Sequence, residues 1–361
     1  MKILILHKNI NWGGGVVNIV RMLMSCGGGD ELTSFFIGPR SQNENRLLST
    51  IRPLLDAVSL AFKPSVKNND LIFVNPSLDT KPFYRDGLFV WVASVLLNKP
   101  VLVFYHGWSN SFYNKLSASA IMRWYFNQTF ARASQSIVLS DQFNANLQAL
   151  GVNQSQVTTL STMYQQDDIP KFEEFVEQPQ GNIRLLFLSR VVKEKGIYEA
   201  INAFQKARAD YPQLILDIAG DGPELANVKR YVGDRGFNDG IVFHGYVAGE
   251  EKKQLLADAG IFLFPAYYGE GCPVALLEAM ASGLPCIVGA AGGISGIFDE
   301  RNGVLLEQVT DQTVLNAIEA LVSDQNSMVE IARHNFQYAS MTFERNIVTR
   351  KIFALCERAI S

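Results

Sequence analysis

Two cations in the second half of the chain have the types and the spacing to bind a phosphorylated compound. Arg190 and Lys195 follow the apolar run 183–189, and Gly196 opens an expected helix. An Arg binds phosphate oxygens bidentately, and a Lys neutralises their charge as a mobile donor, so this pair suits a diphosphate. The alternative is an ordinary Arg and Lys at the surface.

Two glutamates flank the start of another expected helix, in the segment EGCPVALLEAMASGLP. Glu270 lies in the loop before this helix and Glu278 lies within it. A carboxylate in so apolar a helix needs partners such as sugar hydroxyls, unless Glu278 points to solvent. With Pro273 at the first helical position, the free N–H groups of the helix start are expected to form an anion site around Gly271, Cys272, Pro273 and Val274.

The first half has a glycine-rich loop and a histidine at corresponding strand ends. Gly13, Gly14 and Gly15 follow the first expected strand, so the backbone can approach a ligand closely there. Asn18 occupies the third position of a G-x-G-x-x-G pattern, which disfavours NAD. His106 ends the strand VLVFYH, where an imidazole would act as a hydrogen-bond partner or a base, unless it is a packed structural histidine.

The candidate site residues lie between short aliphatic runs that alternate with helical stretches. This alternation predicts parallel sheets flanked by helices. Expected strands in the first half are 2–7, 32–37, 71–75, 101–106 and 136–140. Expected strands in the second half are 183–189, 214–219, 241–243, 261–264, 286–288 and 304–306, followed by helical stretches near 311–322, 328–338 and 343–360. The acidic, proline-containing segment 167–181 predicts a linker, so we expect domains over 1–165 and 182–340 and a final helix over 341–361. Ligands are expected at the carboxyl ends of the strands, facing a cleft between the domains.

Composition excludes several classes of protein. The 361 residues are 48% hydrophobic and 19% charged, with a net charge of −3, which disfavours disorder and nucleic-acid binding. Residues 1–165 carry 14 Lys and Arg against 8 Asp and Glu, a balance of +6, whereas residues 166–361 carry 18 against 27, a balance of −9. The basic half could contact an anionic surface or a pyrophosphate, unless its charge is ordinary solvated charge.

Cysteine usage and hydropathy indicate in which cellular compartment the protein is expected. Four cysteines without a C-x-x-C pair predict a reducing, cytoplasmic compartment. We expect neither a signal peptide nor a transmembrane helix, because every apolar run is too short or interrupted. Without a D-x-D triplet or a zinc-ligand spacing, we expect no protein-bound metal and no cofactor.

Taken together, these motifs resemble retaining glycosyltransferase family 4, which has the GT-B fold of two Rossmann-like domains. The resemblance runs over nearly the whole chain. It is carried by the loop 13–15, the strand end at His106, Ser140, and the segments SRVVKEKG, AGDGPEL, HGYV and EGCPVALLEAMASGLP. It implies an α/β fold with two parallel sheets facing across a cleft and a final helix that returns to the first domain.

The resemblance also implies roles for particular residues. Arg190 and Lys195 would hold the donor diphosphate, Glu278 the nucleotide ribose and Glu270 the hydroxyls of the transferred sugar. His106 would lie beside the reacting end of that sugar. Further donor contacts are expected from Gly14, Gly15, Gly222, Tyr246 and the residues of the helix start, Gly271, Cys272, Pro273 and Val274.

The expected function is metal-independent transfer of a sugar from a nucleoside-diphosphate sugar, with a UDP-sugar favoured over GDP-mannose. The acceptor would be a hydroxyl of a glycan or of a polyprenyl-linked saccharide, in polysaccharide or lipopolysaccharide synthesis. Two alternatives are a non-catalytic subunit of a transferase complex and a nucleotide-sugar epimerase. The stretch 112–131, which mixes aromatic residues with Lys115 and Arg123, could rest on the inner face of a membrane, unless it is a packed core helix.

Overall fold

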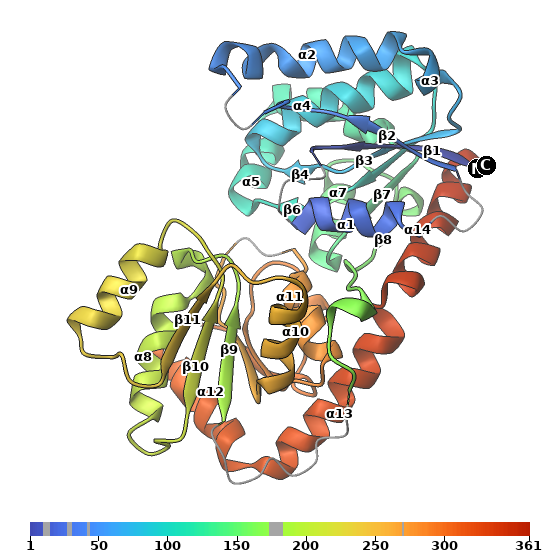
Figure 1. Ribbon diagram of the computed structural model, residues 1–361. Coiled ribbons are helices and arrows are strands. Elements are labelled where there is room, and N and C mark those ends of the chain that lie inside the picture. Colours follow the sequence, from blue (N-terminus) through green and yellow to red (C-terminus); the bar gives the residue numbers. More distant parts are fainter. Residues whose placement is uncertain (10–14, 27–30, 42–43, 173–182, 269–270) are drawn as a thin grey trace. The chain divides into compact units, whose positions relative to one another are not determined.

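The computed structural model describes residues 1–9, 15–26, 31–41, 44–172, 183–268 and 271–361. Its internal contacts divide the chain into two compact units, drawn in Figure 1. Unit 1 comprises Met1–Thr162 and Asn346–Ser361, and unit 2 comprises Met163–Arg345.

Unit 1 is built on a six-stranded parallel sheet with the strand order β2-β1-β3-β5-β7-β8. Its central strands are short runs of buried aliphatic and aromatic residues, which suits strands covered on both faces. The strands are β1 (Lys2–His7), β2 (Glu31–Phe36), β3 (Leu71–Val74), β5 (Val101–Phe104), β7 (Gln135–Val138) and β8 (Val157–Thr159). A small parallel pair, β4 (Ser77–Leu78) and β6 (Gly107–Trp108), continues beyond β3 and β5.

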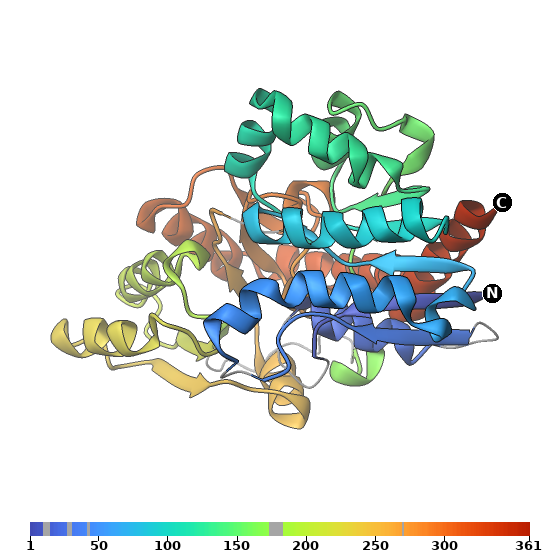
Figure 2. The same cartoon turned by 90° about the horizontal axis from the view of Figure 1, so that it is seen from above.

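Helices connect and cover the strands of unit 1. They are α1 (Gly15–Met24), α2 (Arg46–Phe62), α3 (Pro64–Lys67), α4 (Thr80–Trp91), α5 (Asn110–Ala118), α6 (Ala120–Gln128), α7 (Asp141–Ala149) and α14 (Arg345–Ile360), with a π-helical turn, η1 (Val92–Leu96), after α4. Viewed from above, α2 and α4 lie over the same face of the sheet (Figure 2). The hydroxyl of Thr349 on α14 donates to the sulfur of Cys26, which follows α1, so the last helix is part of this unit.

Unit 2 repeats the architecture with the strand order β11-β10-β9-β12-β13-β14. Its strands are β9 (Arg184–Leu188), β10 (Ile215–Ala219), β11 (Ile241–Gly245), β12 (Ile261–Phe264), β13 (Cys286–Gly289) and β14 (Gly303–Leu306). Its helices are α8 (Ile197–Ala207), α9 (Leu225–Asp234), α10 (Gly249–Asp258), α11 (Val274–Ala281), α12 (Asp311–Ser323) and α13 (Gln325–Thr342). Helices α8 and α12 pack together on a core that includes Phe187, Phe204 and Ile318, and α11 packs against α13.

The expected strands agree with the observed ones to within two residues at each end, and three observed strands, β4, β6 and β8, were not expected. Three other expectations need correction. First, β5 ends at Phe104, so His106 lies beyond the strand. Second, the stretch 112–131 is not one helix, because Ser119 ends α5 and caps α6. Third, the described part of the expected linker folds into unit 2, where Phe172 stacks on Phe336.

Candidate active site

The strand order of unit 2 creates a switch point between β9 and β12, where successive connections leave in opposite directions. In open α/β sheets this is where ligands bind, outside the carboxyl ends of the strands. The loops at this edge are joined by backbone hydrogen bonds. Val191 donates to the carbonyl of Asp221 at 3.0 Å, and Tyr267 donates to the carbonyl of Glu194 at 3.1 Å. The loops after β9, β10 and β12 therefore form one connected rim.

Two glycines allow these loops to approach so closely. Gly196 has a φ of +71°, and a Cβ there would lie 2.1 Å from the carbonyl oxygen of Pro265. A Cβ on Gly222 would lie 2.3 Å from the carbonyl oxygen of Val191. Any larger residue would push the loops apart, so Gly222 shapes the rim through its missing side chain.

The rim carries the two cations that the sequence singled out. Arg190 follows β9 and is exposed, and Lys195 ends the short helix η5 (Lys193–Lys195) and is half-buried. The pKa of Lys195 is lowered to about 8, mainly by burial; the charge of Glu194 opposes this shift and the charge of Arg190 adds to it. Its Nζ lies 5.3 Å from the centroid of the Phe264 ring. The structure thus brings the two cations into electrostatic contact at the switch point.

Helix α11 begins beside this edge, after β12. Pro273 is its N-cap with an extended ψ of 123°, and not its first helical residue as expected, so Val274 is the first residue of the helix. Gly271 and Cys272 are buried just before it. The N-cap makes no side-chain hydrogen bond, which is the arrangement in which a helix start can receive an anion.

Glu278 is buried inside unit 2 and does not point to solvent. Its Oε1 accepts a hydrogen bond from Nζ of Lys252 on α10 at 2.7 Å. Burial raises the pKa of the Glu278 carboxyl, and the Lys252 ammonium opposes that shift. The structure pairs this carboxylate with an ammonium group, and the expected contact with sugar hydroxyls stays a prediction.

In unit 1, His106 follows β5 and is fixed by an amide. Asn75 donates from Nδ2 to the carbonyl of Leu6 at 3.2 Å, so its Oδ1 faces Nε2 of His106, at 2.8 Å. Nε2 must therefore carry the proton, because an amide oxygen only accepts. Burial lowers the pKa of His106 to about 3, so the ring is neutral near pH 7 and its buried Nδ1 is an acceptor without a partner among the described residues.

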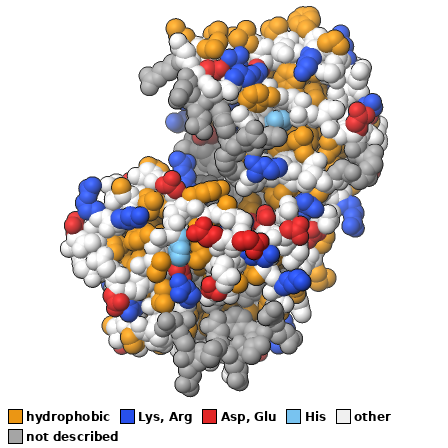
Figure 3. All heavy atoms as spheres, viewed as in Figure 1, with side chains coloured by type: hydrophobic (Ala, Val, Ile, Leu, Met, Phe, Trp, Pro, Cys, Tyr) orange, Lys and Arg blue, Asp and Glu red, His pale blue; other side chains and the backbone are white. Residues whose placement is uncertain are grey.

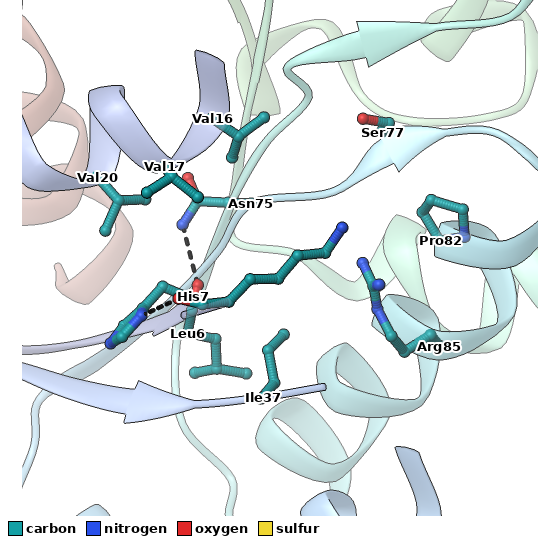
Figure 4. Close-up of a pocket in the computed structure, with 11 residues that line it drawn as sticks. Leu6, His7, Val16, Val17, Val20, Ile37, Asn75, Ser77, Pro82 and Arg85 are labelled. Atoms are coloured by element: carbon teal, nitrogen blue, oxygen red, sulfur yellow. Dashed lines mark hydrogen bonds between the residues drawn. The ribbon is translucent and has the colours of Figure 1, made fainter. Parts of the chain in front are cut away.

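A cavity lies at the switch point of unit 1, between β1 and β3 (Figure 4). Its floor is apolar, with Val16, Val17 and Val20 of α1 pointing toward it, and Arg85 and Pro82 lie on the opposite side. Lys8 also lines the cavity, and burial lowers its pKa. The guanidinium of Arg85 binds the buried carboxylate of Asp86 at 2.6 and 2.7 Å.

The remaining expected site residues lie elsewhere or cannot be placed. Tyr246 is 75% exposed after β11, the edge strand, two strands away from β9. Gly15 is the first residue of α1. Gly14 and Glu270 lie outside the described residues. Sequence reasoning missed Lys8, Asn75, Arg85 and Lys252; of these, Lys8 and Asn75 directly follow strands, which was the available signal.

Three further observations concern metal ligands, cysteines and membrane-spanning helices in the described parts of the chain. Within the described parts of the chain, no group of three or more His, Cys, Asp or Glu residues is placed to hold a metal ion. All four cysteines have free thiols. Among the described helices, none combines the length and the apolar character needed to cross a bilayer.

Two Rossmann-like units with this topology define the GT-B fold. The Anabaena protein Alr3699/HepE, crystallised with UDP and glucose, superimposes over 99% of each chain with a TM-score of 0.74 and 17% identity. The predicted fold class is thereby confirmed.

The family match lies within unit 2. Residues 168–340, slightly less than half of the chain, match the family model described as "Glycosyl transferases group 1", so unit 2 is similar to a group 1 glycosyltransferase domain. WcaL of Escherichia coli (strain K12), named as a colanic acid biosynthesis glycosyltransferase, is 23% identical over 240 residues, which are 64% of this chain and 58% of WcaL. AmsK of Erwinia amylovora, named as an amylovoran biosynthesis glycosyltransferase, is 28% identical over 194 residues, 52% of this chain and 47% of AmsK. The chain thus aligns with only about half the length of these curated relatives.

Proposed function

We propose that the protein is a retaining glycosyltransferase of family 4 that moves a sugar from a nucleoside-diphosphate sugar to a hydroxyl of a glycan or a polyprenyl-linked saccharide. A UDP-sugar is favoured as the donor, with GDP-mannose as the second candidate. The process would be synthesis of a cell-surface polysaccharide or lipopolysaccharide, in the cytoplasm. The names of WcaL and AmsK support this process, and the UDP and glucose bound by HepE support the donor class.

The observation that carries the proposal is the pair Arg190 and Lys195 at the switch point of unit 2. Lys195 is partly buried and lies in electrostatic contact with Arg190. A diphosphate would bind both cations, with the bidentate Arg190 on its outer oxygens and Lys195 neutralising its charge. The start of α11 and the Gly222 turn would add backbone N–H groups.

The proposed catalysis stabilises the negative charge that develops on the leaving group. When the bond between the sugar and the diphosphate breaks, negative charge grows on the leaving phosphate. Arg190 and Lys195 lie on the rim and α11 starts beside it, so these groups would stabilise this charge without a metal. Glu270 would bind hydroxyls of the sugar and Glu278 the ribose.

Unit 1 would bind the acceptor. The cavity beside Lys8 and Arg85 and the acceptor nitrogen Nδ1 of His106 lie at the carboxyl ends of its strands. A neutral imidazole at this place can accept a hydrogen bond from a sugar hydroxyl, and it does not carry a competing charge. We also propose that the basic unit 1 contacts the membrane surface.

Calorimetry with UDP, GDP and ADP, and with their common sugars, tests the donor side. We expect selective binding to the wild type, with affinity reduced roughly 100-fold or more in Arg190→Ala and Lys195→Ala, by the size of charge-assisted contacts. Lys193→Ala, an exposed cation of the same segment, is the matched control and should bind normally. Binding of no nucleotide would favour a non-catalytic subunit, and isomerisation of the donor without an acceptor would favour an epimerase.

A further inference from the structure

Helix α2 presents its apolar side chains outward. The exposed large residues on it are Leu47, Leu48, Ile51, Leu54, Leu55, Val58 and Phe62, and Leu47 and Phe62 are 79% and 76% exposed. Most recur at intervals of three or four, so they form a stripe along one face. Single exposed apolar residues are common on proteins, but a stripe along a whole helix marks an interaction site.

Two charged side chains of α2, Arg52 and Asp56, are instead largely buried and paired. Arg52 forms an ion pair with Glu44, and both side chains are largely buried. Asp56 is buried, binds Arg40 at 2.6 Å, and accepts from the backbone N–H of Gly38 at 2.7 Å. This helix therefore departs from the usual pattern, because Arg52 and Asp56 hold it to unit 1 together with the buried Ala57 and Leu60, while four of its leucines are exposed.

The apolar stripe extends onto a neighbouring element. The π-helical turn η1 packs beside α2, and its Val95 and Leu96 are exposed. In Figure 2, no other helix or strand of unit 1 lies in front of α2. In Figure 3, hydrophobic side chains gather along the upper edge of the molecule, over the place that α2 occupies in Figure 1. We call the exposed residues of α2 and η1 the α2 surface.

The first exposed charges after α2 are positive. Over the described residues from 36 to 68, the acids are Glu44 and Asp56, and both side chains are largely buried in ion pairs. Lys63 and Lys67 are exposed, and the next acid along the chain, Asp70, accepts a hydrogen bond from the backbone N–H of Lys2. An apolar stripe with a basic border is complementary to an anionic lipid surface, where apolar groups enter the acyl boundary and lysines meet the headgroups.

We propose that the α2 surface docks unit 1 onto an anionic lipid bilayer, with α2 lying in the plane of the interface. A second copy of the chain is a poorer occupant, because a symmetric contact would bring the basic borders together. This proposal assigns the membrane contact of unit 1 to α2, in place of the stretch 112–131 that the sequence suggested. Docking of α2 on lipid does not depend on whether the protein transfers a sugar.

Flotation of the full-length chain with vesicles tests the proposal, using phosphatidylcholine alone and an equimolar mixture with phosphatidylglycerol. We expect the wild type to float with the mixed vesicles at low salt and less at high salt. Leu54→Gln with Val58→Gln should lower the bound-to-free ratio roughly tenfold or more, because two apolar side chains no longer leave water. Lys63→Gln with Lys67→Gln should lower it roughly tenfold on mixed vesicles and leave phosphatidylcholine binding unchanged.

Two control variants locate the effect. Ile121→Gln with Trp124→Gln alters exposed residues of α6, and Met341→Gln alters an exposed residue of unit 2; both should float like the wild type. Because all these positions are exposed, thermal unfolding and UDP binding should stay unchanged, which separates this proposal from the donor proposal.

Three results would overturn the inference. The wild type could fail to float with mixed vesicles at low salt. Flotation could be lost through the α6 changes and kept through the α2 changes. Finally, sedimentation could reveal a dimer that the α2 changes dissociate, without lipid binding, and the surface would then belong to a second copy.

Discussion

The ionisation of Lys195 links the donor site to pH. Its pKa of about 8 in the free protein means that the ammonium form, which the proposed diphosphate needs, is lost as the pH rises through 8. We therefore expect UDP affinity to be constant from about pH 7 to 8 and then to fall by up to tenfold per pH unit. Calorimetry between about pH 7 and 9 measures this. Lys195→Arg should remove the fall, and an identical fall in that variant would assign it to another group.

The neutral state of His106 makes the stability of the fold depend on pH in the opposite direction, so that stability is lost as the pH falls. Its pKa falls from 6.5 to about 3 on folding, so below pH 6.5 the unfolded chain binds the proton more readily than the folded one. Stability contributed by the neutral ring is complete above pH 6.5 and is lost as the pH falls, at roughly 1.4 kcal/mol per unit.

Urea unfolding at about pH 7 and pH 5.5 checks this expectation against His106→Gln, which keeps a donor for Asn75 and cannot titrate. The variant should lose about 1.4 kcal/mol less than the wild type over that interval. Equal losses in the two proteins would place the acid sensitivity on other residues.

At the scale of the elements, the rim of unit 2 depends on backbone contact at Gly196. Gly196→Ala combines a left-handed φ with a Cβ placed against Pro265, so we expect a loss of about 2–4 kcal/mol in the free energy of unfolding, together with weaker UDP binding. Gly233→Ala in α9 is the matched control, since its Cβ meets nothing within 4 Å and should stabilise by about 0.5–1 kcal/mol. Denaturant titration of both variants measures these changes in the free energy of unfolding. Equal changes in the two variants would mean that Gly196 and Pro265 do not approach so closely in solution.

The elements could be predicted from sequence because each strand is a short aliphatic run between turn residues. The glycines and cations of the rim could also be found, since they lie in the loops that follow expected strands. The partner of Glu278 could not be predicted, because it depends on where α10 lies in the folded unit, and Lys252 and Lys253 are equally plausible in sequence. Likewise, the periodicity of α2 indicates an apolar stripe but not that the stripe faces away from the sheet.

At the scale of the molecule, unit 1 is discontinuous. Val348, Thr349, Ile352, Leu355 and Cys356 of α14 are buried, and residues 346–361 belong to unit 1. Removing residues 346–361 should therefore destabilise unit 1 and leave unit 2 intact. Hydrogen exchange should report lost protection in β1 and β3 with protection retained in β9 and β12. Equal loss in both sheets would show that the units do not unfold separately.

The discontinuity of unit 1 also sets an order of events during synthesis. A ribosome makes residues 1–162 first, yet the helix that completes this unit is translated only after all of unit 2. The nascent chain therefore carries an unfinished first unit for as long as residues 163–345 take to emerge, while unit 2 can close as soon as its own strands are made. The residues of unit 1 that pack against α14 therefore lack this cover while residues 163–345 are being synthesised.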